Sequence, residues 1–223
     1  MDSILHYQQI ASTLSMLMLF AAFALLINKR ILSLINSFAI QSFLLALATF
    51  GQAFILHRYA IYFSALLTLT LKVILIPWFL RRLIFKLKIP KEIPQITHPF
   101  FTLFGALALV IFCYYIIAPI NLFPSIAAKN IVVVAMTIIL LGMLLMIIRS
   151  NAISHVIGFM VMENGLFFAA LISTQGVPMI VELGVAFDLL VAVVLFGVFF
   201  FHIRSSIDSM DVDSLNRLRE DTE

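Results

Sequence analysis

The stretch GFMVMENGLFFAAL, residues 158–171, places Glu163 and Asn164 side by side in the middle of a long apolar run. The run extends on both sides, over residues 153–174. About 20 apolar residues in a helix cross the ~30 Å hydrocarbon layer of a membrane. The stretch therefore predicts a membrane-spanning helix with a carboxyl group near its centre.

The composition of the whole chain indicates an integral membrane protein. Of its 223 residues, 63% are hydrophobic and 11% are charged, whereas soluble domains are nearer half apolar and a quarter charged. The single cysteine, Cys113, excludes an intrachain disulfide and a cluster of thiolate metal ligands. No glycine-rich phosphate loop and no basic stripe for nucleic acid is visible. We expect no cofactor in this chain, and a lipid bilayer as its surroundings.

Seven apolar segments are long enough to span a membrane. They predict an all-α polytopic protein with about seven transmembrane helices. The segments cover residues 8–28, 32–55, 59–80, 99–119, 128–148, 153–174 and 178–202. Because the leader before the first segment has no Lys or Arg, and basic residues follow that segment, we do not expect a cleaved signal peptide.

The basic residues predict the orientation, since cytoplasmic loops of membrane proteins are enriched in Lys and Arg. With the N-terminus outside, eleven basic residues fall on the cytoplasmic side and two, Arg58 and Lys129, fall on the outer side. The remaining basic residue, Lys72, lies within a segment. We therefore expect an outer N-terminus and a cytoplasmic C-terminus.

Three ionisable residues lie well inside the predicted segments: Lys72, Glu163 and Asp188. A charge at the centre of a membrane helix costs on the order of 3 kcal/mol or more, so such residues face partner helices or a hydrated cavity and often pair with each other. Burial favours the neutral form of a carboxyl group, and a nearby ammonium group opposes this effect. Two acids with a lysine nearby could therefore form a proton relay. The alternative is a fixed ion pair that only sets the register of the helices.

Two further ionisable residues lie near the ends of segments. His155 lies near the inner end of its segment, where it is either an interfacial histidine or a peripheral member of the relay. Glu182 begins the last segment near the outer surface, where the helix dipole favours a carboxylate. Glu182 is therefore either a solvated N-terminal residue or a proton gate.

Polar residues in the second and sixth segments coincide in a weak internal repeat. Residues 31–44 align without gaps on residues 153–166. The aligned polar pairs are Gln41 with Glu163 and Ser42 with Asn164. Gln41 and Asn164 are therefore candidates for the periphery of the relay.

The third and seventh segments extend the repeat. Residues 70–76 align on residues 186–192, which places Lys72 on Asp188. Duplicated three-helix units are a common way to build transport proteins. We predict a first three-helix unit (1–82), a basic inner loop with a connecting helix (83–126), a second three-helix unit (127–203) and a polar cytoplasmic tail (204–223).

The second unit resembles the K-type membrane subunit of respiratory complex I, which has three helices and a glutamate within each of the last two. Glu163, in GFMVMENG, matches the first glutamate, and Asp188, in VELGVAFDLLVAVV, matches the second as an aspartate. The tail MDVDSLNRLR is similar as well. The C-type subunit of the multisubunit Na⁺/H⁺ antiporters is similar in the same region.

Nearly end to end, the chain resembles the hydrogenase-4 component E family of membrane-bound nickel–iron hydrogenase and formate hydrogenlyase complexes. The ordered set that carries this resemblance is Gln41, the run SALLTLTLKVILIPWFL, the Met-Glu-Asn-Gly run, the Val-Glu-Leu-Gly…Asp run and the Asp-Val tail. The aspartate at 188 and the added Lys72 depart from the K-type pattern, which changes the tuning of any relay.

The resemblance implies a non-catalytic subunit of an ion-translocating redox complex in a bacterial or archaeal cytoplasmic membrane. Antiporter-like subunits and a hydrogenase or related redox arm would be its partners. It also implies that protons pass by Glu163 and Asp188, with Lys72 modulating both acids. A structural membrane anchor and a stand-alone small ion transporter are the alternatives.

Overall fold

The computed structural model describes residues 2–86, 98–120 and 125–173, together with the single positions 184, 191 and 197. Contacts within the chain divide it into a larger unit, Met1–Ala186, and a smaller unit, Phe187–Glu223. The helices named below all belong to the larger unit. The predicted seventh segment and the polar tail lie outside the described residues, apart from the three single positions 184, 191 and 197 in that segment.

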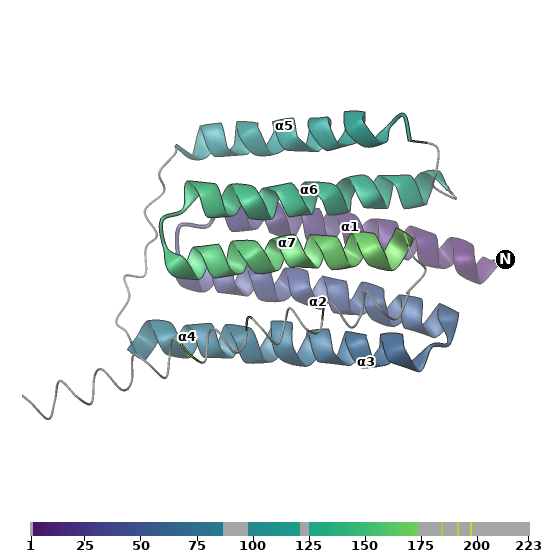
Figure 1. Cartoon of the computed structure of the whole chain (residues 1–223), viewed down its shortest axis with the longest axis horizontal. Coiled ribbons are helices and arrows are strands. Elements are labelled where there is room, and N and C mark those ends of the chain that lie inside the picture. Colours follow the sequence, from purple (N-terminus) through teal and green to yellow (C-terminus); the bar gives the residue numbers. More distant parts are fainter. Residues whose placement is uncertain are drawn as a thin grey trace, which may run out of the picture. The chain divides into compact units, whose positions relative to one another are not determined.

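The described part of the larger unit consists of long helices that run side by side (Figure 1). They are α1 (Asp2–Ile27), α2 (Ile31–Leu56), α3 (Tyr59–Thr68), the π-helix η1 (Leu69–Leu75), α4 (Ile76–Lys86), α5 (Pro99–Ile117), α6 (Ile126–Ile148) and α7 (Ala152–Ser173). Because α3, η1 and α4 follow one another without a break, they form one continuous helix. Counted this way, six helices of the described residues are long and apolar enough to cross a membrane.

The first six predicted segments are confirmed as helices of this length and composition. The third helix runs further than the predicted end at residue 80, because its last part is amphipathic. Phe79, Leu80 and Leu83 are buried there, whereas Arg81 and Arg82 are exposed. An apolar stripe of this spacing keeps a helix packed after it has become too polar for the bilayer core. The predicted orientation of the termini and the predicted domain boundaries stay predictions.

Four helices form the centre of the bundle. Helix α1 packs against α2 and α6, and α7 packs against α6 and α2. The continuous helix α3–η1–α4 lies against α2 on one side of this core, and α5 lies against α6 on the other side (Figure 1). This arrangement brings η1 and α2 together with α7, which is far from both in the sequence.

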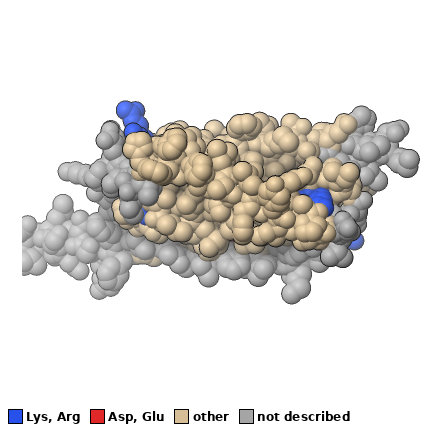
Figure 2. All heavy atoms as spheres, turned by 90° about the horizontal axis from the view of Figure 1, so that it is seen from above, with Lys and Arg blue, Asp and Glu red and all other residues tan. Residues whose placement is uncertain are grey.

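The outer wall of the bundle is suited to a lipid environment. Helix α5 exposes a series of large apolar side chains, among them Phe100, Phe104 and Ile111. In the view of Figure 2, the Lys and Arg atoms of the described residues lie toward the two ends, and the wall between them carries neither these nor acidic residues. An apolar band bounded by charges is the pattern of a membrane-spanning surface.

Glycines set the packing of α6 against α7. A Cβ atom added to Gly142 would lie 2.7 Å from the carbonyl oxygen of Gly158, and one added to Gly165 would lie 2.9 Å from that of Ala135. Small residues allow membrane helices to approach backbone to backbone in this way. Since Gly158 and Gly165 are seven residues apart, they share one face of α7. Glu163 lies about 200° around the helix from Gly165 and therefore faces away from α6.

Candidate functional site

Lys72 and Glu163 form an ion pair in the interior of the bundle. The Lys72 Nζ lies 3.3 Å from Glu163 Oε1, and the two side chains are 3% and 7% exposed. Lys72 belongs to η1 and Glu163 to the middle of α7. The sequence left the partner of Lys72 open, and the structure identifies it as Glu163. An uncompensated charge at this depth would be costly, so each residue offsets the burial of the other.

Asn164 extends this ion pair into a network. Its Oδ1 accepts a hydrogen bond of 3.0 Å from Lys72 Nζ, and its Nδ2 donates one of 3.1 Å to Ser42 Oγ. The polar chain Glu163–Lys72–Asn164–Ser42 thus joins α7, η1 and α2. The ammonium group of lysine has three donors and no acceptor. Two of these donors point at oxygens of α7, which fixes the Lys72 side chain against that helix.

Lys72 sits in a π-helical turn for a reason that lies in the sequence. The backbone N–H of Ile76 donates to the carbonyl of Leu71, five residues earlier. Pro77 follows directly and lacks the N–H that would bond the carbonyl of Val73 in an α-helix. A local change of helical pitch accommodates such a residue. Single π-helical turns inside α-helices are frequent at functional sites, and Lys72 is the buried residue of this one.

Gln41, which the repeat aligns with Glu163, faces a different neighbour. Its Nε2 donates a hydrogen bond of 3.4 Å to the carbonyl oxygen of Met18 in α1. Gln41 precedes Ser42 in the chain and lies at the level of the network. Its buried Oε1 is an acceptor that receives no hydrogen bond from the described residues.

Of the remaining predicted site residues, His155 is the one that lies within the described part of the chain. His155 is exposed in the first turns of α7, and its Nδ1 lies 2.9 Å from the carbonyl oxygen of Asn151. At a rise of ~1.5 Å per residue, it lies about 12 Å along α7 from Glu163. Asp188 and Glu182 lie outside the described residues. The second acid of the predicted relay therefore stays a prediction.

Arg149 has a structural role that its sequence position did not reveal. The residue is buried, and its Nη2 donates to the carbonyl oxygens of Leu26 at 3.0 Å and Asn28 at 2.6 Å. The last carbonyls of a helix lack partners within that helix. Burial lowers the pKa of the Arg149 guanidinium below its ordinary value. Arginine stays protonated in proteins, so this side chain ties the end of α1 to the α6–α7 loop.

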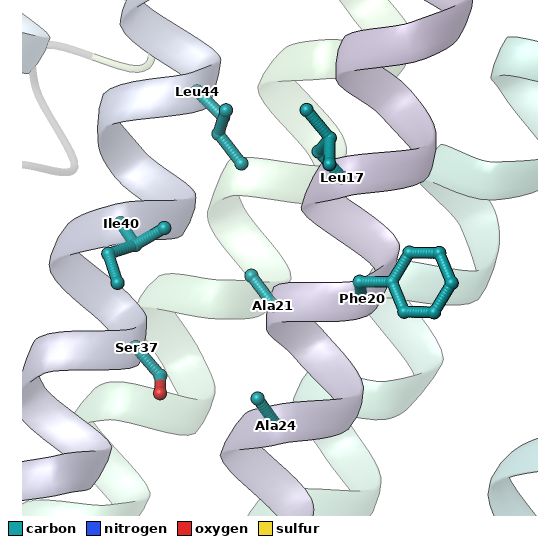
Figure 3. A pocket seen from close by; sticks show the side chains of 7 residues that line it. All are labelled: Leu17, Phe20, Ala21, Ala24, Ser37, Ile40 and Leu44. Carbon is teal, nitrogen blue, oxygen red and sulfur yellow. The ribbon is translucent and has the colours of Figure 1, made fainter.

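The bundle also carries an apolar groove between α1 and α2, with a volume of about 360 Å³. Figure 3 shows Ser37 as the one polar side chain among those labelled in it. The others are Leu17, Phe20, Ala21, Ala24, Ile40 and Leu44. No ionisable side chain lines this groove.

The described residues contain no group of three or more His, Cys, Asp or Glu that could hold a metal ion.

Comparison with known proteins gives two kinds of relatives. The Mycobacterium tuberculosis protein named "Uncharacterized protein Rv0085" is 31% identical over 154 residues, which cover 68% of this chain and 70% of that protein. Proteins named "Hydrogenase-4 component E" from Escherichia coli and Shigella flexneri are 28% identical over 158 residues, or 70% of this chain and 71% of each relative. No family model and no solved structure matches the chain.

The mycobacterial relative is more than 30% identical to this chain over more than two thirds of its length. The hydrogenase-4 components are matched over a similar share of their length. The chain therefore belongs to the family of this mycobacterial protein and is a membrane-embedded homologue of hydrogenase-4 component E.

Proposed function

We propose that this chain is a non-catalytic membrane subunit of a multisubunit, ion-translocating redox complex of the hydrogenase type. The homology to a protein named as a hydrogenase component supports the complex, and the apolar helices support the membrane location. Antiporter-like membrane subunits and a hydrogenase or related redox arm would be its partners. Redox centres would reside in those partners, since an iron–sulfur cluster needs about four ligands, mostly cysteine thiolates, and this chain has one cysteine.

We further propose that Lys72 and Glu163 belong to a proton relay in the membrane arm. The ion pair supports this proposal, because a carboxyl group, which can bind and release a proton, lies beside an ammonium group in the interior of the bundle. A proton that binds Glu163 converts the carboxylate to a neutral acid and removes its attraction for Lys72. Lys72 then keeps the hydrogen bond to Asn164 Oδ1. Release of the proton restores the ion pair, so the site returns to its starting state.

In this proposed cycle, Glu163 binds and releases a proton while the helices keep one arrangement. Asp188 would be the second acid of the relay, with Glu182 and His155 at its periphery. The N-terminus would lie outside and the C-terminus in the cytoplasm of a bacterial or archaeal cell, as the distribution of Lys and Arg indicates.

The test replaces the ionisable groups in the whole complex. Glu163→Gln and Asp188→Asn keep the size of each side chain and remove its titration. Lys29→Gln is the matched control, because Lys29 is an exposed cation at the end of α1. Assembly is measured by co-purification of partner chains, and proton transfer is measured during redox turnover in sealed vesicles. We expect normal assembly and a loss of coupled proton transfer for the two acid variants, and no loss for the control.

Two outcomes would overturn the relay. Assembled Glu163→Gln and Asp188→Asn complexes with unchanged proton transfer would exclude both acids from the route. Loss of the complex in both variants would support the alternative of a structural anchor. Proton transport by the purified chain alone would support a stand-alone transporter.

A further inference from the structure

Buried polar residues continue from the ion pair along one face of the third helix. Ser64, Thr68 and Lys72 follow one another at intervals of four residues, and all three are buried. Residues at this spacing lie above one another on a helix. The row runs from the centre of the bundle toward the turn that joins α2 to α3 at residues 57–58.

Helix α2 presents a second row of buried polar residues in the same half of the bundle. Ser42, Thr49 and Gln52 are buried on this helix. Because α2 and α3 run antiparallel from a short turn, residues at similar distances from the turn lie at similar levels. Gln52 is thus level with the region of Ser64, and Ser42 with that of Lys72. The two rows therefore cover the same levels of the bundle, from the ion pair to the α2–α3 turn.

The opposite half of the bundle is sealed by apolar side chains. The buried residues on the other side of the pair are large and apolar on each of the three helices. They are Leu34, Ile35 and Phe38 on α2, Ile76, Phe79 and Leu80 on α4, and Ile153, Ile157 and Met160 on α7. Two buried polar residues, Ser154 in the first turn of α7 and Arg149 shortly before α7, lie at the far edge of this apolar layer, and Ser154 Oγ has no hydrogen-bond partner among the described residues. Between this edge and the ion pair, the buried residues named above are apolar, whereas on α2 and α3 buried polar residues continue toward the α2–α3 turn.

Two buried amide oxygens supply a second, independent observation. The Oε1 atoms of Gln41 and Gln52 have no hydrogen-bond partner within the described residues. Both side chains are more than nine-tenths buried. An unsatisfied buried acceptor costs about 1–3 kcal/mol, and ordered water commonly removes that cost. Gln52 belongs to the row on α2 and lies near its outer end, whereas the side chain of Gln41 hydrogen-bonds to Met18 of α1 at the level of the ion pair.

We infer that the polar rows of α2 and α3 form a hydrated access path from the α2–α3 turn to the Lys72–Glu163 pair. The apolar layer closes the other half of the bundle. Water in the path donates a hydrogen bond to the amide oxygen of Gln52 and exchanges hydrogen bonds with the hydroxyl group of Thr68. This part rests on the proposed function: Glu163 exchanges protons with the side of the membrane on which the α2–α3 turn lies. With the predicted orientation, this is the outer side.

Cysteine accessibility tests the path directly. Cys113→Ala first removes the native thiol, and single cysteines then replace Ser64 or Thr68 in the path. Leu34→Cys and Ile157→Cys are the matched controls in the apolar layer. A charged, membrane-impermeant methanethiosulfonate reagent is added to one side of sealed vesicles, and then to the other side. The protein is kept in its native membranes, and its amount in the membrane reports folding of each variant.

Labelling of Ser64→Cys and Thr68→Cys is expected from the side of the α2–α3 turn only. It should be at least about tenfold faster than labelling of the controls from either side, because the reactive thiolate is suppressed in dry apolar surroundings. Equal rates at path and control positions would overturn the path. Rapid labelling of Leu34→Cys or Ile157→Cys from the opposite side would contradict the inference that the apolar layer closes the other half of the bundle.

The labelling result is independent of proton transfer, so the two proposals fail separately. Labelled path positions together with intact proton transfer in Glu163→Gln would leave the path standing and remove the relay. Unlabelled path positions together with lost proton transfer in Glu163→Gln would keep the relay and remove this route to it.

Discussion

Asn164 Nδ2 donates a hydrogen bond of 3.1 Å to Ser42 Oγ, which joins α7 to α2 beside the buried ion pair. This bond holds the amide so that its oxygen faces Lys72 Nζ at 3.0 Å. A single side chain therefore satisfies one hydroxyl and one ammonium group in the membrane interior. Ser42 and Asn164 are also the positions that the internal alignment places on each other, although the predicted two-unit organisation stays a prediction.

Replacement of Asn164 tests this arrangement. Asn164→Leu removes both hydrogen bonds and leaves Ser42 and one donor of Lys72 without this partner. We expect the free energy of unfolding to fall by about 1–3 kcal/mol, the usual cost of unsatisfied buried groups. Thermal unfolding of the purified chain in detergent measures the effect. Asn130→Leu is the control, since Asn130 is exposed on α6, and an equal loss in both variants would contradict the assigned role.

The ion pair predicts a non-additive double mutant. Lys72→Met leaves the Glu163 carboxylate buried without its cation, and breaking a buried pair in this way costs about 3–5 kcal/mol. The double variant Lys72→Met/Glu163→Leu removes both charges and should recover most of this loss. Unfolding of the two single variants and the double variant completes the cycle. Additive effects of the two substitutions would show that the 3.3 Å contact contributes nothing to stability.

The close glycine contacts between α6 and α7 predict that an added methyl group destabilises the protein at these positions and not elsewhere. Gly142→Ala places a Cβ 2.7 Å from the backbone of Gly158 and of Met162, so the helices must separate. Overpacking of this kind costs about 1–3 kcal/mol. Gly105→Ala on α5 is the matched control, because nothing lies within 4 Å of its added Cβ. Melting temperatures that move equally in the two variants would rule out a tight seam.

Arg149 predicts a local rather than a global weakness. Arg149→Ala deprives the carbonyls of Leu26 and Asn28 of a buried donor, at a cost of about 1–3 kcal/mol. The end of α1 should then become sensitive to limited proteolysis before the rest of the bundle. Arg30→Ala removes an exposed arginine from the same region and should leave the digestion pattern unchanged. Identical proteolysis patterns for the two variants would contradict the role of Arg149 in holding the end of α1.

Much of this architecture could be predicted from the sequence, because hydrophobic length alone determines where a membrane helix fits. The burial of Lys72 and Glu163 followed from their positions in apolar runs. Their pairing could not be predicted, since it depends on which helices are neighbours in space. The order of helices in turn depends on contacts such as the Gly142–Gly158 approach, whose effect on helix rotation no single run of sequence reveals.

Two local features were also missed, although each has a signal. Pro77, placed five residues after Lys72, is the residue that could have indicated the π-helical turn. From the sequence, Arg149 is one of the basic residues expected on the cytoplasmic side. The unpaired carbonyls at the end of a preceding helix are the feature that such an arginine satisfies, and only the three-dimensional neighbourhood shows that α1 ends beside it.

The glycine contacts of α6 and α7 have a mechanical consequence. The backbones of the two helices approach closely at these glycines, so α7 is held firmly against α6. Glu163 is carried by α7, whereas Lys72 is carried by a helix whose pitch changes at that point. When the distance between the two charges changes, we expect the backbone of η1 to move more easily than that of α7.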